Sequence, residues 1–195
     1  MERIDLYDQN RKPLGKTAIK YMPLAEGEYQ IIVHVCLFND KNEMLIQQRA
    51  LDKIDFPGMW DISSGGGVMA GEEAYQAAER ELFEELGLSV SLEDERPYLT
   101  IHYPNGFDDY YLISCDKNIN EFIIPQDEVL AITWKSKTEI LQMIAEGNFI
   151  NYNEGFIELL FSMKKNRGSY PRKWCDFYEA SRFFWQHWGW KNYGR

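Results

Sequence analysis

A run of three glycines followed by a glutamate-rich segment constrains this chain more than any other feature of its sequence. Residues 65–67 are all glycine, and glycine allows close backbone approach and positive φ because it has no Cβ. Good helix formers fill the segment from Ala74 to Leu86, and Gly87 stands where helices commonly end. We therefore predict a glycine loop that packs against one acidic helix.

Three carboxylates of this helix share a face. Residues three and four apart lie side by side on a helix, which groups Glu81, Glu84 and Glu85. Three carboxylates in one patch repel each other, and a hard divalent cation with oxygen ligands is the natural way to offset that repulsion. Arg80 can pair with a carboxylate and hold it in place. The alternative is an acidic helix face that only meets solvent.

The stretch from Gly66 to Leu88 resembles the Nudix box. That motif reads Gly, five residues, Glu, seven residues, Arg-Glu, an apolar residue, any residue, Glu-Glu, any residue, Gly and an apolar residue. All nine fixed positions match, and they are Gly66, Glu72, Arg80, Glu81, Leu82, Glu84, Glu85, Gly87 and Leu88. A match over this many positions is far more specific than a short glycine motif.

The resemblance implies a fold, a reaction and a set of site residues. The fold would be α+β, a Nudix-type α/β/α sandwich around a mixed sheet. The reaction would be Mg²⁺- or Mn²⁺-dependent cleavage of a pyrophosphate linkage in a nucleoside diphosphate derivative or a similar small diphosphate. Carried over by position, the metal ligands are Gly65 through its carbonyl, Glu81, Glu84 and Glu85. The catalytic set is Glu81, Glu84, Glu72 and Arg80, in which Glu72 and Arg80 support the helix and its carboxylates.

The motif does not fix the group that takes a proton from the attacking water. Glu81 is one candidate. Asp108 and Asp109 on the strand after a predicted hairpin, and Glu128 before Val129, are the candidates outside the box.

Similarity beyond the box points to one branch of the family. Residues 47–49, 57–58, 60–61 and 127–129 with Trp134 resemble the branch that contains isopentenyl diphosphate isomerase. Those isomerases carry a catalytic cysteine just before the first glycine of the box and a metal-binding histidine just after it. This chain has Gly65 and Gly67 there, so hydrolysis is favoured over isomerisation. A non-catalytic, nucleotide-binding module of the same fold is the third possibility.

The order of the predicted elements agrees with an α+β domain. Strands are predicted at 29–38, 43–49, 60–64, 98–103, 107–115 and 131–134, and helices near 74–86, 136–146 and 156–165. We divide the chain into an N-terminal extension (1–28), the Nudix domain (29–162) and a basic, aromatic helical segment (163–195). We expect that last segment to pack on the domain, although it could instead close over the substrate or form a homodimer contact.

Charge and composition exclude several classes of protein. A formal net charge of -10 argues against a stable interaction with nucleic acid. No apolar run is long enough to span a bilayer, and the N-terminus does not resemble a signal peptide. Three widely spaced cysteines form neither a metal motif nor a disulfide framework, which is typical of a cytoplasmic protein.

Overall fold

A mixed β-sheet forms the centre of the part of the chain that the computed structural model describes, residues 2–164. The elements in order are β1 (Arg3–Tyr7), β2 (Pro13–Ile19), β3 (Gln30–Phe38), β4 (Glu43–Arg49), β5 (Trp60–Asp61), β6 (Ser64–Gly67), α1 (Ala74–Leu86), β7 (Leu99–Tyr103), β8 (Gly106–Ser114), a 3₁₀ turn (Ile119–Glu121), β9 (Val129–Ser136), α2 (Lys137–Ala145) and α3 (Glu154–Met163).

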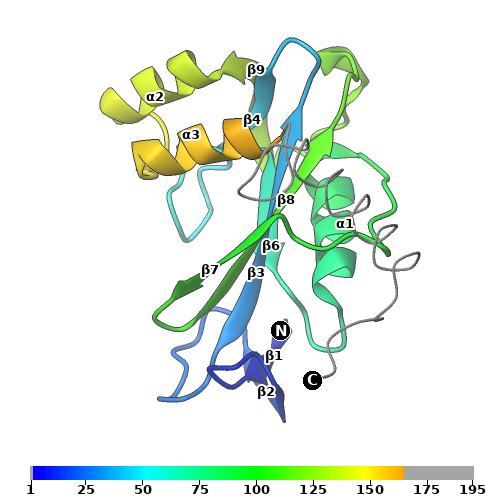
Figure 1. The fold of residues 1–195 in the computed structure, drawn as a ribbon, viewed down its shortest axis with the longest axis vertical. Helices are drawn as coiled ribbons and strands as arrows, with labels where there is room; N and C mark the ends of the chain where they lie inside the picture. The colour runs from blue at the N-terminus through cyan, green and yellow to red at the C-terminus, as the bar shows by residue number, and fades with distance from the viewer. Residues whose placement is uncertain (1, 165–195) are drawn as a thin grey trace, which may run out of the picture.

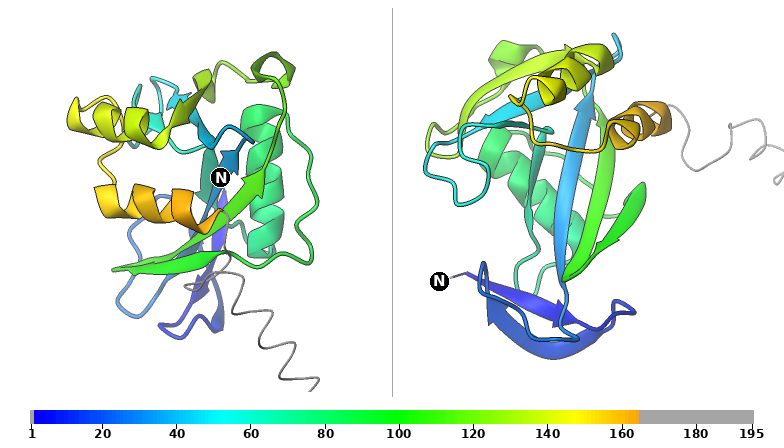
Figure 2. Two further views of the ribbon diagram at one scale, coloured as in Figure 1. Left: turned by 45° about the horizontal axis from the view of Figure 1, so that its top comes forward. Right: turned by 90° about the vertical axis from the view of Figure 1, so that its left-hand side faces the viewer.

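The main sheet has the strand order β5-β4-β3-β8-β7, with β6 added alongside β3 and β9 alongside β4. β3 and β8 run parallel, and the remaining pairs of this sheet run antiparallel. Helix α1 covers one face, while α2 and α3 cover the other (Figures 1 and 2). The predicted α+β sandwich around a mixed sheet is confirmed.

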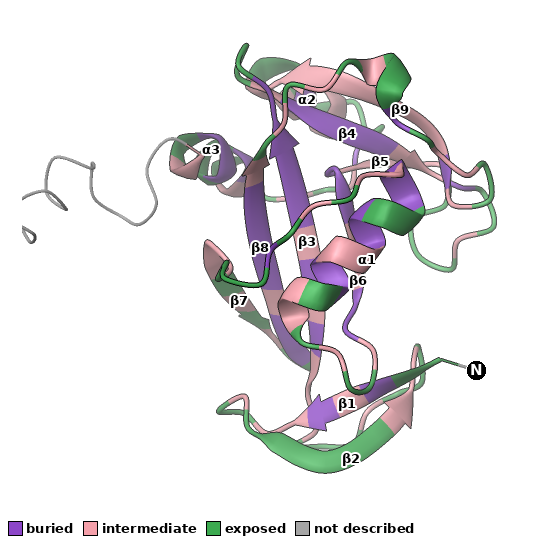
Figure 3. Ribbon diagram, turned by 90° about the vertical axis from the view of Figure 1, so that its right-hand side faces the viewer, coloured by how far each residue is buried: buried purple, intermediate pink, exposed green. Residues whose placement is uncertain are grey.

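Alternation along the strands divides the core between the two faces. Successive side chains of a strand point to opposite sides, so Val33 and Val35 of β3 pack with α1. Cys36 and Phe38 of the same strand pack with α2 and α3. Figure 3 shows the buried stripe of α1 turned toward the sheet.

The glycine run differs from its prediction. We expected a short strand at 60–64 that leads into a glycine loop, whereas the chain forms β5, breaks, and then continues as β6 through the glycines. Gly65 is paired with His34 of β3. Two of these glycines are required by close contacts, because a Cβ atom at Gly65 would collide with the backbone of β3 and one at Gly66 with the side chain of Glu81.

The first two strands form a separate hairpin beside the main sheet, at the bottom of Figure 1. The hairpin is tied to the loop before α1, since the Ala70 N–H donates to the Arg3 carbonyl across 2.8 Å and the Gly71 N–H donates to Asp5 Oδ2 across 2.7 Å. The predicted N-terminal extension, residues 1–28, therefore contacts the loop that follows the glycine strand. The predicted domain boundaries stay a prediction.

The predicted C-terminal helical segment lies outside the described residues, apart from its first two positions. Within residues 2–164, no helix combines the length and the apolar character that crossing a bilayer requires.

Candidate active site

Helix α1 has well-defined ends, which fix the direction of each of its side chains. The Glu73 N–H donates to the Gln76 side chain across 2.9 Å at the start of the helix. Gly87 ends it in the left-handed conformation, with φ at 61°, and returns its N–H to carbonyls of the last turn. Ala77, Ala78, Leu82 and Leu86 are completely buried against the sheet. This packing turns Glu81 and Glu85 toward β6.

The three glutamates of the predicted metal site do not share one environment. Glu81 and Glu85 are buried, with 7% and 5% of their surface exposed. The side chain of Glu84 is half exposed. The helical spacing predicts that these three side chains share a face of the helix. It does not predict that Glu81 and Glu85 are buried while Glu84 is half exposed.

Glu85 is a buried carboxylate that accepts hydrogen bonds. Its Oε2 atom accepts from Gln47 Nε2 across 3.0 Å and from the Gly65 N–H across 3.2 Å. Burial, with a further contribution from the charge of Glu81, raises the pKa of Glu85 to about 7, although hydrogen bonding by the Ser64 side chain, by Gln47 and by the Gly65 backbone favours the charged form. A cation at this position would relieve the penalty.

Glu81 lies against Gly66. A Cβ atom at Gly66 would come within 2.8 Å of both carboxylate oxygens of Glu81, so the strand must be glycine here for the carboxylate to keep its place. Burial raises the pKa of Glu81, and the positive charges of Arg80 and Lys20 oppose that rise. Glu81 is thus held close to the backbone of β6.

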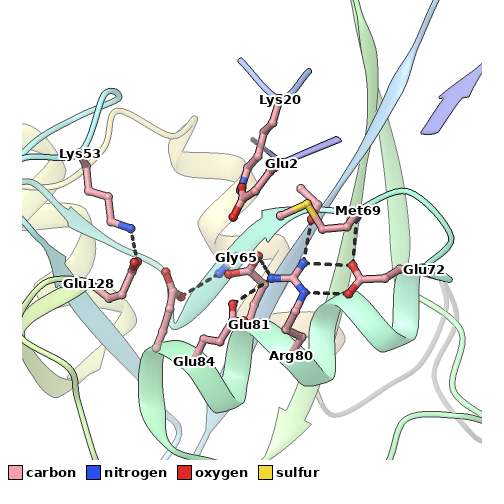
Figure 4. A network of polar contacts seen from close by, with 12 residues as sticks. Glu2, Lys20, Lys53, Gly65, Met69, Glu72, Arg80, Glu81, Glu84 and Glu128 are labelled. Atoms are coloured by element: carbon pink, nitrogen blue, oxygen red, sulfur yellow. Dashed lines mark hydrogen bonds and ion pairs between the residues drawn. The ribbon is translucent and has the colours of Figure 1, made fainter. Parts of the chain in front are cut away.

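Arg80 links the helix, the loop and the strand (Figure 4). Its guanidinium holds both carboxylate oxygens of Glu72, at 2.8 and 3.1 Å, and donates to the Gly67 carbonyl at 2.9 Å. A third nitrogen reaches Glu81 at 2.7 Å and Glu84 at 2.9 Å. Glu72 also accepts from the Met69 N–H at 2.9 Å. Glu72 and Arg80, the predicted supporting pair, therefore contact each other, and Arg80 in turn contacts the carboxylates of Glu81 and Glu84.

The residues around Glu85 fit a divalent cation. The Oε1 atom of Gln47 is buried without a hydrogen-bond partner, the Ser64 hydroxyl lies beside the carboxylate of Glu85, and the carboxylates of Glu81 and Glu85 are turned to the same strand. Oxygen atoms of this kind are the ligands that Mg²⁺ and Mn²⁺ prefer. No three acidic, histidine or cysteine side chains within residues 2–164 are already arranged around one point, since Glu81 and Glu84 are both turned to Arg80.

The candidate proton acceptors outside the box fall in three different places. Asp109 is fully buried in an ion pair with Arg11 and accepts from Thr100 as well. Asp108 lies on the opposite side of β8, on the face of the sheet that α2 and α3 cover. Its Oδ1 atom lies 3.3 Å from His34 Nε2. Glu128 pairs with Lys53, and both are drawn within the polar network of Figure 4. Of these three, Glu128 is the one that Figure 4 includes in the network with Glu81 and Glu84.

Two contributors to the site were not identified from the sequence. Gln47 entered the sequence analysis only as part of a wider resemblance, because it opens the polar end of β4 and nothing in the sequence marks it as buried. Lys20 gave no signal, because its place depends on how the N-terminal hairpin packs against β6.

Comparisons with known proteins agree with this arrangement. The sequence model of the NUDIX domain matches residues 28–158. An uncharacterized Nudix hydrolase of Listeria monocytogenes is 40% identical over 84% of this chain and 96% of that relative. An isopentenyl-diphosphate delta-isomerase of Pectobacterium atrosepticum is 32% identical over 73% of this chain and 80% of that protein.

Solved structures agree in fold. A Deinococcus radiodurans protein superposes with a TM-score of 0.66 at 24% identity, covering 82% of this chain and 97% of that one. A MutT protein of Methanosarcina mazei gives a TM-score of 0.55 at 21% identity, covering 73% of this chain and all of that one.

Proposed function

This chain belongs to the Nudix hydrolase family, and we propose that it uses Mg²⁺ or Mn²⁺ to cleave a pyrophosphate linkage in a nucleoside diphosphate derivative or a similar small diphosphate. Nudix hydrolases generally use divalent metal ions and act on small molecules. The observation that carries the proposal is the buried pair Glu81 and Glu85 beneath the glycine strand, within a complete Nudix box.

In this proposal Glu81, Glu84, Glu85 and the Gly65 carbonyl hold the metal. A divalent ion supplies the positive charge that polarises the phosphoryl oxygens and offsets the charge of the leaving group. Arg80 and Glu72 keep the carboxylates in position through the contacts described above.

The reaction itself is a hydrolysis at phosphorus. A water oxygen forms a bond to phosphorus, the bridging P–O bond breaks, and the leaving phosphate keeps the bond's electron pair. Glu81 or Glu128 takes the proton of the water. Asp109 is disfavoured as the base because it is completely buried in its ion pair with Arg11, whereas the side chain of Glu128 is partly exposed in its pair with Lys53. Asp108 is disfavoured because it lies beside His34, on the face of the sheet opposite α1.

The isomerase relative supports a second candidate, an enzyme that moves the double bond of an isoprenoid diphosphate. The glycine at position 65 argues against it, because glycine has no side chain to protonate a carbon. A Cβ atom there would lie 2.8 Å from the Val33 carbonyl oxygen, so the strand as it stands leaves no room for a cysteine.

One panel of substrates separates these candidates. Nucleotide sugars, dinucleotides, nucleoside triphosphates and isopentenyl diphosphate are incubated with the full chain and Mg²⁺, and the products are followed by phosphate release and by NMR. We expect metal-dependent phosphate-containing products from at least one nucleotide and no double-bond migration. Glu81→Gln should abolish the reaction, while the exposed Glu158→Gln on α3 serves as the matched acid-to-amide control. Turnover that survives both a chelator and Glu81→Gln would refute the proposal.

Other expectations from the sequence also stay predictions. They are a cytoplasmic location, the lack of stable nucleic-acid binding and a possible homodimer. Size-exclusion chromatography with light scattering would measure the oligomeric state.

A further inference from the structure

A lysine of the N-terminal hairpin lies over the glycine strand. Lys20 follows the end of β2, and its Cε atom lies 3.5 Å from the place where a Cβ of Gly67 would be. Figure 4 shows Lys20 and Glu2 entering the polar network from the side of the hairpin, opposite the helix that carries Arg80. The lack of a side chain at Gly67 therefore leaves room for Lys20 above β6. Lys20 precedes the segment that the NUDIX model matches, which begins at residue 28.

The ammonium group of Lys20 acts on the same carboxylates as Arg80. Burial raises the pKa of Glu81, and the charges of Arg80 and then Lys20 oppose the rise. Lys20 is also among the groups that hold the pKa of Glu72 below its ordinary value against the effect of burial. Arg80 on α1 and Lys20 after β2 thus both place positive charge near Glu72 and Glu81. Lys20 has fewer contacts than Arg80.

Lys20 contacts the ring of Tyr21, whose centroid lies 5.2 Å from Nζ, and forms an ion pair with Glu2. Its Nζ atom lies 2.9 Å from Glu2 Oε2, and 60% of the Glu2 side chain is exposed, compared with 16% of the Lys20 side chain. An ion pair with one solvent-exposed partner contributes little to stability, because water competes for the exposed charge. An anion at the site can therefore replace Glu2 without a large loss.

From this placement we propose that Lys20 binds a phosphate group of the substrate and exchanges Glu2 for it. The proposal rests on the proposed function, since it assumes that an anionic diphosphate is drawn to an acidic site. Glu81, Glu84 and Glu85 repel such a substrate, and a lysine that presents three rotatable donors over β6 offsets part of that repulsion.

The hairpin does not depend on Lys20 for its position. Arg3 Nε donates to Thr17 Oγ1 across 2.8 Å, and the backbone contacts of Arg3 and Asp5 with residues 70 and 71 join the hairpin to the loop before α1. Lys20→Gln should therefore leave the fold intact and test the ammonium group alone.

The test measures binding of methylenediphosphonate, a diphosphate that cannot be hydrolysed, by calorimetry in the presence of Mg²⁺. We expect Lys20→Gln to weaken binding at least about tenfold, the loss typical of one charge-assisted hydrogen bond. The matched control is Lys16→Gln, which lies in β2 and pairs with Glu28 across 3.3 Å. That variant should bind like the wild type. Glu2→Gln, which frees Lys20, should bind as tightly as the wild type or more tightly.

Equal affinities of Lys20→Gln and wild type would overturn the assignment, and so would a wild-type protein that does not bind the diphosphonate. With a substrate from the panel, Lys20→Gln should raise KM by a similar factor and change kcat less, whereas a merely structural role would lower the melting temperature. The proposed function fails on a different result, the absence of metal-dependent turnover in the wild type, so the two failures can be told apart.

Discussion

The Gln47 side chain donates a hydrogen bond to the carboxylate of Glu85 across 3.0 Å, which joins strand β4 to helix α1 in the interior of the protein. The amide oxygen of Gln47 has no partner of its own, although the residue is only 2% exposed. A buried amide that uses its donor on a carboxylate and leaves its acceptor open is costly unless something else binds there. This pair therefore couples the charge of Glu85 to the stability of the protein, and a bound cation would act on both.

Replacing Gln47 should impair metal binding. Gln47→Leu removes a donor from a buried carboxylate, and we expect about a 10- to 100-fold loss in Mg²⁺ affinity or in activity, the range typical of residues that orient a metal ligand. Calorimetric titration with Mg²⁺ and steady-state kinetics measure the effect. Gln142→Leu on the exposed side of α2 is the control, and unchanged metal affinity in Gln47→Leu would contradict this role.

Glu85 should make the metal-free protein less stable at neutral pH than in mild acid. Its pKa is raised to about 7 from an ordinary 4.5 because burial disfavours the charged form, so the folded state holds the proton more tightly than the unfolded state. The stabilising effect of that proton is complete below about pH 4.5 and is lost as the pH rises through about 7. The expected loss of unfolding free energy is on the order of 1–3 kcal/mol.

Urea denaturation in the presence of a chelator, at pH 5.5 and at pH 8, measures this difference. Glu85→Gln lacks the titrating group, so it should be more stable than the wild type at pH 8 without metal, yet inactive. Added Mg²⁺ should stabilise the wild type at pH 8 and have little effect on the variant. A Glu85→Gln protein that is less stable than the wild type at pH 8 would refute the argument.

A methyl group at Gly66 should damage activity more than stability. The added Cβ would collide with the carboxylate of Glu81, which is the end of a flexible side chain and can swing aside. We expect Gly66→Ala to fold, with a melting temperature lowered by only a few degrees, and to lose at least about 100-fold in kcat. Gly155→Ala in α3 is the control, where the nearest atom is a side-chain oxygen at 3.3 Å. Full activity in Gly66→Ala would show that the position of Glu81 is unimportant.

Asp109 and Glu128 should respond to substitution in opposite ways. Asp109→Asn leaves Arg11 with a neutral partner in a fully buried position, and we expect a loss of about 2 kcal/mol in stability with kcat little changed.

The side chain of Glu128 is partly exposed, so Glu128→Gln should leave the stability of the protein unchanged. A drop in kcat of at least about 100-fold in Glu128→Gln would identify it as the proton acceptor, and wild-type kcat would assign that role to Glu81.

The sequence by itself determined the elements whose signals are local. Helix α1 runs from Ala74 to Leu86 and ends at Gly87, as its composition predicts, because helix propensity and the glycine C-cap act within a few residues. Strand β4 and helix α2, with its Ser136 cap, also lie where predicted. The Nudix box, and with it the fold class and the family, could be read directly from residues 66–88.

Tertiary structure decided which of the predicted residues meet. Asp108 and Asp109 are neighbours in the sequence, but alternation along β8 sends them to opposite faces of the sheet, and only the pairing of β8 with β3 fixes which face each one meets. The different burial of Glu84 and Glu85, the contact of Gln47 with Glu85 and the approach of Lys20 to β6 likewise depend on strand register and on the packing of the N-terminal hairpin. Such contacts join residues tens of positions apart, and short-range propensities carry no information about them.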